Sequence, residues 1–210
     1  MKHYLLLLFG LSVSFCSEIN AHNIDTLFIN TPRHIMPLLD KTSKMDLIDL
    51  YNEGLKAKVV NIYGGDTFLL KKTDKFLSLQ TTKSGIWTMK ILSCDNNSQL
   101  ILCLHTVDAK GMSTNITAYS LDWNLKKIQI PLFSPIDFFK NPQSYIPSSK
   151  QTIISSFKYL PIEAQVCDST DLIRFKLSPQ GLIPEFMDSF TESINSICLR
   201  WDGSAFVRED

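Results

Sequence analysis

Histidines are the first side chains in this sequence that could bind a metal ion. If the chain were cut after Ala21, His22 would lie at a new N-terminus, where the amine and the imidazole together can bind copper. His34 and His105 would be the remaining histidines available to complete such a site. A frayed terminus is the simpler interpretation of His22, and strand alternation around His105 favours a surface or core residue. We therefore predict no metal site and no cofactor.

Three carboxylates stand close together in a segment expected to be helical. Asp46, Asp49 and Glu53 follow one another at intervals of three and four residues, and paired carboxylates can bind calcium or act as an acid and a base. Here they lie opposite an apolar stripe, which is typical of the solvated face of a helix. The sequence also lacks the calcium loop of an EF-hand. We predict a solvent-exposed helix face.

Motifs for nucleophilic catalysis and for phosphate binding are almost absent. Ser155 and Lys158 form an S-x-x-K pair, the spacing with which a lysine activates a serine in penicillin-binding enzymes. The S-D-N and K-T-G elements that those enzymes also require do not occur, and neither does G-x-S-x-G. The glycine-rich loops that bind phosphate are missing as well. The sequence therefore predicts no catalytic residue.

Tryptophan side chains are the candidates for a binding surface. Trp87, Trp123 and Trp201, together with Tyr119 and Phe206, could form an aromatic platform for a sugar or a peptide. In strands that alternate in hydrophobicity, the packing face of a sheet is the simpler interpretation. Both interpretations stay open at this level.

The cysteines that follow residue 21 are Cys94, Cys103, Cys167 and Cys198. An even number in an exported chain allows two disulfides. Cys167 and Cys198 each lie in a predicted strand of the C-terminal half, which allows a bridge between them. Free thiols that pack as small apolar residues are the simpler interpretation. No C-x-x-C pair occurs, so the sequence predicts neither a zinc site nor a thioredoxin-like site.

The N-terminal segment has the pattern of an export signal. Lys2 is followed by twelve mostly apolar residues, 4–15, which is too few to cross a bilayer core that requires about 20. The small residue Ala21 fits a cleavage site, so we predict a signal peptide over residues 1–21 and a location in the periplasm or at the cell surface. Cys16 leaves a lipid anchor as the alternative, although Phe15 before it is larger than a lipoprotein signal requires. No later run reaches transmembrane length.

Composition and charge limit the partners. The chain of 210 residues is 44% hydrophobic and 20% charged, with 21 basic and 21 acidic residues, which is typical of a globular protein. A chain without net charge has no broad basic face for phosphates, so we predict no binding to nucleic acid. The partners that remain are an envelope protein or a glycan.

Hydrophobic periodicity predicts helices first and a sheet afterwards. The segment 24–53 has helical spacing, interrupted at Pro32 and Pro37, with a capping box that begins at Ser43 and a stop at Gly54. Closely spaced strands with short turns follow, which is typical of an antiparallel meander. Polar alternation within these strands indicates that one face of the meander is exposed.

Prolines interrupt this pattern over residues 131–147 and divide the chain. The predicted organisation is a helix-and-sheet part over 22–130, a proline-rich connector over 131–147, and a smaller second half over 148–210. Helices and strands that follow one another in separate groups along the chain predict an α+β fold. The second half is expected to hold a helix, a strand pair, a short helix over 181–190 and a closing β-hairpin.

Two short stretches allow a duplication between the halves. "LDWNLKKI" at 121–128 and "LRWDGSAF" at 199–206 share a Leu, a Trp, a turn-forming residue and an apolar residue in register. Coincidence is the simpler explanation for so short a match.

The stretch "SICLRWDGSAFVRED" predicts the closing hairpin. Asp202 and Gly203 fit a two-residue type I′ turn, because such a turn needs positive φ at both positions. This register would pair Trp201 with Ser204 and would place Trp201 and Phe206 on one face.

The sequence also resembles a known family. The run "IDTLFINTPRHIMPLLDKTSKMDLIDLYNEGLKAKVVNIYGGDTFLL", the Asp122-Trp123 pair, the segment 137–139 and the closing Trp201-Asp202-Gly203 are similar to an uncharacterised family of secreted Bacteroidales proteins, a domain of unknown function. The resemblance covers nearly the whole chain after the signal segment. It implies an exported α+β protein, periplasmic or surface-associated, and it brings no activity, cofactor or catalytic residue with it.

These observations favour a non-catalytic protein of the cell envelope that binds a partner through a sheet face or a hairpin edge. The alternative is an exported hydrolase that acts on glycans or peptides through carboxylates brought together by the fold. That alternative requires a cleft with at least two buried carboxylates.

Overall fold

The computed structural model describes residues 23–140, 147–182 and 194–209. The signal peptide predicted over 1–21, His22 and most of the helix predicted over 181–190 lie outside these residues. The elements in chain order are α1 (Ile24–Ile29), α2 (Lys41–Asn52), β1 (Lys58–Val60), β2 (Asp66–Lys72), β3 (Phe76–Thr82), β4 (Gly85–Ser93), β5 (Gln99–Asp108), β6 (Met112–Ser120), β7 (Leu125–Lys126), the 3-10 helix η1 (Pro135–Phe138), α3 (Pro147–Ser155), β8 (Ile162–Val166), β9 (Leu172–Leu177), the 3-10 helix η3 (Pro179–Gly181), β10 (Ser196–Trp201) and β11 (Phe206–Arg208).

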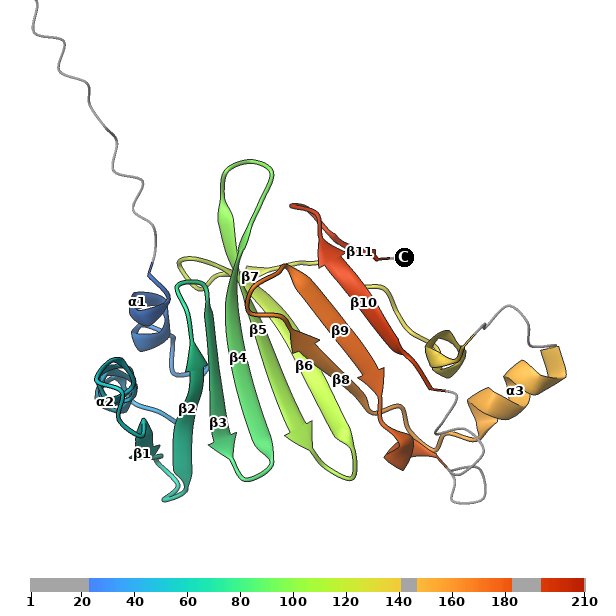
Figure 1. Ribbon diagram of the computed structural model, residues 1–210, viewed down its shortest axis with the longest axis horizontal. Coiled ribbons are helices and arrows are strands. Elements are labelled where there is room, and N and C mark those ends of the chain that lie inside the picture. The colour runs from blue at the N-terminus through green and yellow to red at the C-terminus, as the bar shows by residue number, and fades with distance from the viewer. Residues whose placement is uncertain (1–22, 141–146, 183–193, 210) are drawn as a thin grey trace, which may run out of the picture.

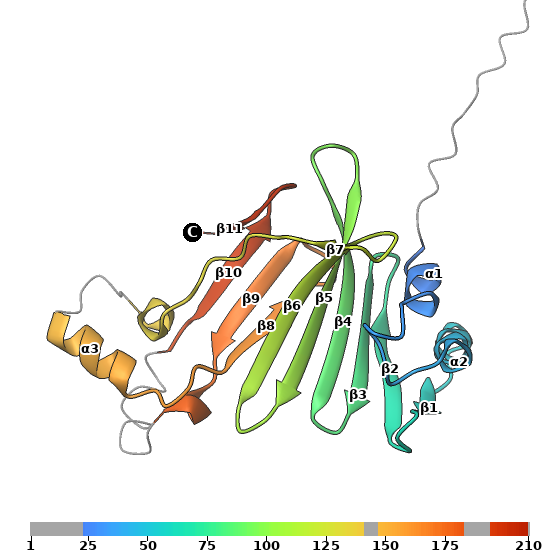
Figure 2. The same cartoon turned by 180° about the vertical axis from the view of Figure 1, so that it is seen from behind.

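Two antiparallel sheets form the body of the molecule (Figures 1 and 2). The first sheet has seven strands in the order β1-β2-β3-β4-β5-β6-β7, which is a simple meander. The second has four strands in the order β11-β10-β9-β8. Helices α1 and α2 lie at the β2 side of the first sheet, and α3 lies beyond the second sheet (Figure 1). The fold is therefore mostly antiparallel sheet with few helices, in agreement with the predicted α+β class.

Alternating side chains give the first sheet two buried faces. In β5, Ile101 and Cys103 join a core with α1 and α2, whereas Leu102 and Leu104 join a core with the second sheet. Successive side chains of a strand point to opposite faces, so odd-numbered residues of β4, β5 and β6 lie on one face and even-numbered residues on the other. We name these the helix face and the sheet face. The prediction of one exposed face is therefore wrong for the central strands.

Helix α2 packs on the helix face, and its two ends are defined by particular residues. The carboxylate of Asp40 accepts a hydrogen bond of 2.7 Å from the backbone N–H of Ser43, and the helix begins at Lys41. The cap predicted at Ser43 is therefore wrong by three residues. The predicted stop at Gly54 is confirmed, since this residue has a φ of +71° that a side chain would strain.

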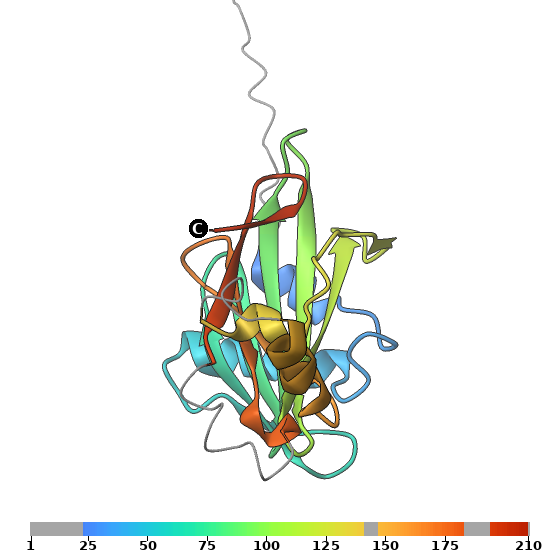
Figure 3. The ribbon, with the colours of Figure 1, turned by 90° about the vertical axis from the view of Figure 1, so that its right-hand side faces the viewer.

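The sheet face packs against the second sheet. Phe175, Leu199 and Trp201 of the second sheet share a core with Leu102 and Leu104. The connector contributes to the same core, because the ring centroid of Phe133 lies 4.9 Å from that of Phe175. In the side view, η1 and α3 lie at the near end, between β10 and β6 (Figure 3). The two predicted halves therefore fold against each other around one core.

The closing hairpin has the predicted face and a different register. Trp201 pairs with Phe206 and not with Ser204, so a four-residue loop joins β10 to β11. The carboxylate of Asp202 holds this loop, because it accepts hydrogen bonds of 2.8 Å from the backbone N–H groups of Ser204 and Ala205. Trp201 and Phe206 are nevertheless buried side by side, with ring centroids 5.1 Å apart.

The two stretches that allowed a duplication have different backbones. Trp123 lies in the turn between β6 and β7 with a φ of +63°, whereas Trp201 is the last residue of β10. The match between them is therefore no sign of a repeated structural unit. Within the described part of the chain, the helices are all too short or too polar to cross a membrane.

Candidate binding site on the helix face

The helix face changes from apolar to polar along its strands. Beside the helices it carries buried apolar side chains such as Met89. Towards the β5–β6 turn, His105 lies directly opposite Asn115, and Cys103 lies directly opposite Thr117. All four point to the helix face, because residues that pair across two strands share a face. A strip of polar groups therefore continues the apolar core.

The segment between α1 and α2 folds over the border of this strip. Pro32 and Pro37 prevent it from continuing either helix. The buried side chain of Met36 anchors it in the core, and the carbonyl of Leu38 accepts a hydrogen bond of 3.1 Å from the backbone N–H of Ile62. The segment is thus held at both its middle and its end.

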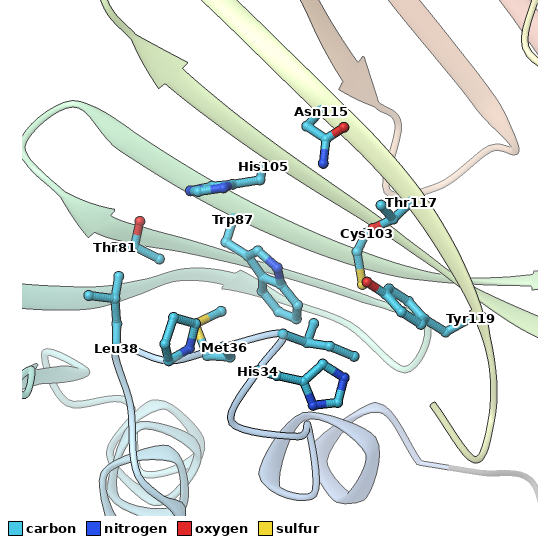
Figure 4. A pocket seen from close by; sticks show the side chains of 12 residues that line it. His34, Met36, Leu38, Thr81, Trp87, Cys103, His105, Asn115, Thr117 and Tyr119 are labelled. Atoms are coloured by element: carbon cyan, nitrogen blue, oxygen red, sulfur yellow. The ribbon is translucent and has the colours of Figure 1, made fainter. Parts of the chain in front are cut away.

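A cavity of about 240 Å³ lies between this segment and strands β3 to β6 (Figure 4). We name it the sheet cavity. Its apolar walls include the buried side chains of Trp87 and Met36, and its polar walls include His105, Asn115 and Thr117. The described residues that line it include no Asp, Glu, Lys or Arg. Its chemistry is therefore that of an aromatic surface beside amide, hydroxyl and imidazole groups.

Two of the side chains that line the cavity, Thr81 and Cys103, are buried. The hydroxyl of Thr81 is buried and has no hydrogen-bond partner among the described residues. Cys103 is also buried, and burial raises the pKa of its thiol far above the ordinary value. Because the thiolate is the nucleophilic form, Cys103 cannot act as a nucleophile near neutral pH.

The three tryptophans that were candidates for a binding surface do not form one platform. Trp87 lies in the sheet cavity, and Trp123 packs near it, with its ring centroid 5.6 Å from that of Tyr119. Trp201 lies on the opposite side of the first sheet, where its indole N–H donates a hydrogen bond of 2.7 Å to the carbonyl of Ser93. Trp201 is therefore a core residue, and of the three tryptophans only Trp87 lines one of the five cavities found among the described residues.

The bridge allowed between Cys167 and Cys198 does not form. All four described cysteines are free thiols. Cys198 lies in β10 and Cys167 directly follows β8, while β9 runs between these two strands. Strands two places apart are separated by about 9–10 Å, and a disulfide needs Cα atoms within about 7 Å. The intervening strand therefore prevents the bond.

Neither the paired carboxylates that the hydrolase alternative requires nor a cluster of metal ligands is found in the described residues. None of five cavities there is lined by two carboxylates, and no three potential metal ligands lie together. Helix α3 ends at Ser155, whose hydroxyl donates a hydrogen bond of 3.0 Å to the carbonyl of Thr152. Lys158 lies beyond that helix, so the S-x-x-K spacing does not place it one helical turn from the serine.

The fold and the cavity can now be compared with known proteins. A family described as proteins of unknown function, DUF3256, matches residues 16–206. The chain belongs to this family. The resemblance predicted from the sequence is thereby confirmed, and the DUF3256 description assigns no activity. A comparison with curated proteins gives no match.

A solved structure has the same fold. It is the "Structure of a domain of an uncharacterized protein from Porphyromonas gingivalis W83", which is 21% identical in sequence, with a TM-score of 0.72. The similarity covers 88% of this chain and 98% of that one. Porphyromonas gingivalis belongs to the Bacteroidales, in agreement with the predicted family. At this identity the similarity establishes the fold alone.

The sequence interpretation did not predict the polar strip as a site, although the register of the β5–β6 hairpin would have indicated it. From the sequence, His34 and His105 were candidate metal ligands beside His22, and both line the sheet cavity. Once the β5–β6 hairpin is placed in register, His105, Asn115 and Thr117 fall on one face. The covering segment that completes the cavity cannot be found in this way, because its contacts with the sheet are long-range.

Proposed function

We propose that this DUF3256 protein is an exported, non-catalytic binding protein of the cell envelope, located in the periplasm or at the cell surface. We propose further that it binds an uncharged, hydroxyl-bearing group in the sheet cavity. The observation that carries this proposal is the convergence of His105, Asn115 and Thr117 beside the indole of Trp87.

The composition of the cavity supports a neutral ligand. Charged ligands are bound by opposite charges, and none of the Asp, Glu, Lys or Arg side chains described lines this cavity. Asn115 supplies both a donor and an acceptor, and Thr117 can act as either. A ligand with several hydroxyl groups can satisfy such a set, and an apolar face of the ligand can stack on Trp87.

The size of the cavity supports a small group. Cavities that hold drug-sized ligands usually measure about 300–1000 Å³, whereas this one measures about 240 Å³. One sugar ring of a glycan or one polar side chain of a partner protein fits that scale better than an extended ligand. Of the two, we propose a sugar unit of an envelope glycan, because aromatic stacking combined with amide and hydroxyl groups suits a ring that has apolar faces and polar edges.

The test is binding of neutral saccharides by the chain without residues 1–21. Titration followed by NMR should give saturable shifts in the backbone amides around Asn115. Replacing Asn115 by Ala or His105 by Ala should weaken the affinity about tenfold, because the ligand loses a hydrogen bond to the cavity wall. Asn124 provides a matched control, since it is an exposed asparagine outside the cavity, and Asn124→Ala should leave the affinity unchanged.

Two outcomes would contradict the proposal. Binding that is unaffected by both Asn115→Ala and His105→Ala would place the ligand elsewhere. Hydrolysis of the saccharide by the wild-type chain would contradict the non-catalytic part of the proposal.

Export is tested independently of binding. The N-terminal sequence of the protein isolated from the envelope of its native host should begin at His22. A mature chain that begins with a lipid-modified Cys16 would support the lipid-anchor alternative. Full-length protein in the cytoplasm would contradict both.

A further inference from the structure

A second cavity lies on the other side of the segment that covers the sheet cavity. It measures about 550 Å³ and lies between the end of α1, the beginning of α2 and Ile62 of the β1–β2 turn. We name it the helix cavity. Pro37 lines both cavities, so the same segment forms a wall of each. The chemistry of the second cavity is nevertheless different.

Basic side chains dominate the helix cavity. Arg33, Lys41 and Lys44 line it, and the only acidic side chain among its described lining residues is Asp40. The carboxylate of Asp40 caps α2 through the hydrogen bond to Ser43 and also attracts the ammonium of Lys44. No ion pair of Arg33, Lys41 or Lys44 is found within the described part of the chain. Three cations against one carboxylate leave the cavity with an excess of positive charge among its described lining residues.

Lys44 is the cation that most needs a counterion. Its exposed fraction is 2%, and its ammonium donates one hydrogen bond, of 2.7 Å, to the backbone carbonyl of Thr31. An ammonium has three hydrogens to donate, so a single carbonyl satisfies it incompletely. Burial lowers the pKa of Lys44 to about 8, against the opposing effect of the charge on Asp40. A buried ammonium that keeps its charge is costly without further partners, and an anion in the cavity would supply them.

We propose that the helix cavity is a binding site for an oxyanion, either a carboxylate or a sulfate or phosphate group. The ammonium of Lys44 is the buried anchor, and the side chains of Arg33 and Lys41 hold the anion at the rim. The guanidinium of Arg33 can bind two oxygens of such a group at once. This site is distinct from the sheet cavity, whose described lining includes no Asp, Glu, Lys or Arg and which is proposed to take a different kind of ligand.

A purely structural role of Lys44 is the competing explanation. Its bond to Thr31 ties α2 to the end of α1 and would be useful without any ligand. That role does not involve Arg33 or Lys41, because neither has an ion pair or a side-chain hydrogen bond among the described residues, and both are exposed. Variants of these two residues therefore separate ligand binding from folding.

The experiment is a titration of the chain without residues 1–21 with sodium acetate, sulfate and phosphate at constant ionic strength. The backbone amides of residues 41–44 and of Ile62 are followed by NMR. At least one anion should give saturable shifts. Arg33→Gln and Lys41→Gln should each weaken its binding about fivefold or more, as expected for the loss of a charge-assisted hydrogen bond. Lys44→Met should abolish binding, and Arg33→Gln and Lys41→Gln decide the matter if that variant does not fold.

Matched controls make the result decisive. Lys75 is an exposed lysine in the β2–β3 turn and does not line the cavity, so Lys75→Gln removes the same charge outside the site and should leave anion binding unchanged. Asn115→Ala in the sheet cavity should leave it unchanged as well. Preference for acetate would assign a carboxylate, and preference for sulfate or phosphate would assign a tetrahedral anion. Shifts that do not saturate with any of the three anions, or equal weakening by Lys75→Gln, would overturn the proposal.

Discussion

The ammonium of Lys90 in β4 donates a hydrogen bond of 2.7 Å to the backbone carbonyl of Cys167, which directly follows β8. The same ammonium donates a second hydrogen bond, of 2.5 Å, to the backbone carbonyl of Thr170. It also lies 3.2 Å from a carboxylate oxygen of Asp171. The exposed fraction of Lys90 is only 2%. A single buried cation therefore joins the first sheet to the β8–β9 turn of the second.

Replacing Lys90 by Met should destabilise the protein by about 3 kcal/mol. Methionine keeps most of the apolar stem, but it leaves the carbonyls of Cys167 and Thr170 without their donor and Asp171 without its partner. Urea unfolding followed by circular dichroism measures the change in free energy. Lys71 is the matched control, because it pairs with Asp168 of the same turn but is exposed. An equal loss in Lys71→Met would mean that burial of Lys90 is not the cause.

Replacing Trp201 by Ala should lower the free energy of unfolding by about 3–5 kcal/mol, because it leaves a cavity between the sheets and an unpaired carbonyl at Ser93. Residues of both sheets share this core, so the whole chain should lose stability in one transition. Urea unfolding should give the same midpoint by fluorescence and by circular dichroism. Val207→Ala, at an exposed position of the same hairpin, is the control. Two separate transitions would contradict a shared core.

The closing hairpin shows what local sequence can and cannot predict. The face of Trp201 and Phe206 was predicted correctly even though their register was wrong. The observed loop is two residues longer than the predicted one, and a shift of two residues leaves each side chain on its face. The error came from Asp202, whose carboxylate binds the backbone of Ser204 and Ala205 and thereby widens the turn.

The candidate site was less predictable because it depends on long-range contacts. The alternation that places His105 and Asn115 on one face is local, but their pairing requires the register of β5 and β6. The wall formed by Met36 and Pro37 comes from a segment far away in the sequence. The helix cavity depends in the same way on Lys44 reaching the end of α1. Periodicity therefore predicted strands and helices, whereas the cavities required the tertiary structure.

Replacing Gly203 by Ala should destabilise the protein by about 1–2 kcal/mol, because Gly203 has a φ of +107° that a side chain would strain. A Cβ there would also displace the carboxylate of Asp95, which is the end of an exposed side chain. Gly64 has a similar φ of +81°, but a Cβ there would meet no atom within 4 Å. Gly64→Ala should therefore cost only the backbone strain, about 1 kcal/mol. Thermal unfolding of both variants measures the difference. Equal losses would mean that displacing the carboxylate of Asp95 costs nothing.

The thiol of Cys167 should be the reactive one in the native protein. Hydrogen bonds from Ser169 and Thr170 lower its pKa to about 7, and it is only partly buried. Since a lowered pKa favours the thiolate, the rate of alkylation by iodoacetamide should rise with pH and reach half its maximum near pH 7. Mass spectrometry of the labelled peptides at a series of pH values measures this rate. Cys103 should remain unlabelled throughout, because burial keeps its thiol protonated and inaccessible.

The variant Ser169→Ala tests the cause of this reactivity. It removes the hydroxyl that lies 3.4 Å from the sulfur of Cys167, so the pKa should move back towards the ordinary value of about 8.5. The midpoint of the alkylation profile should rise accordingly, while the rate at high pH should stay close to that of the wild type. Ser204→Ala, in the loop of the closing hairpin, is the control and should leave the profile unchanged. A midpoint that stays near pH 7 in Ser169→Ala would show that the hydroxyl does not stabilise the thiolate.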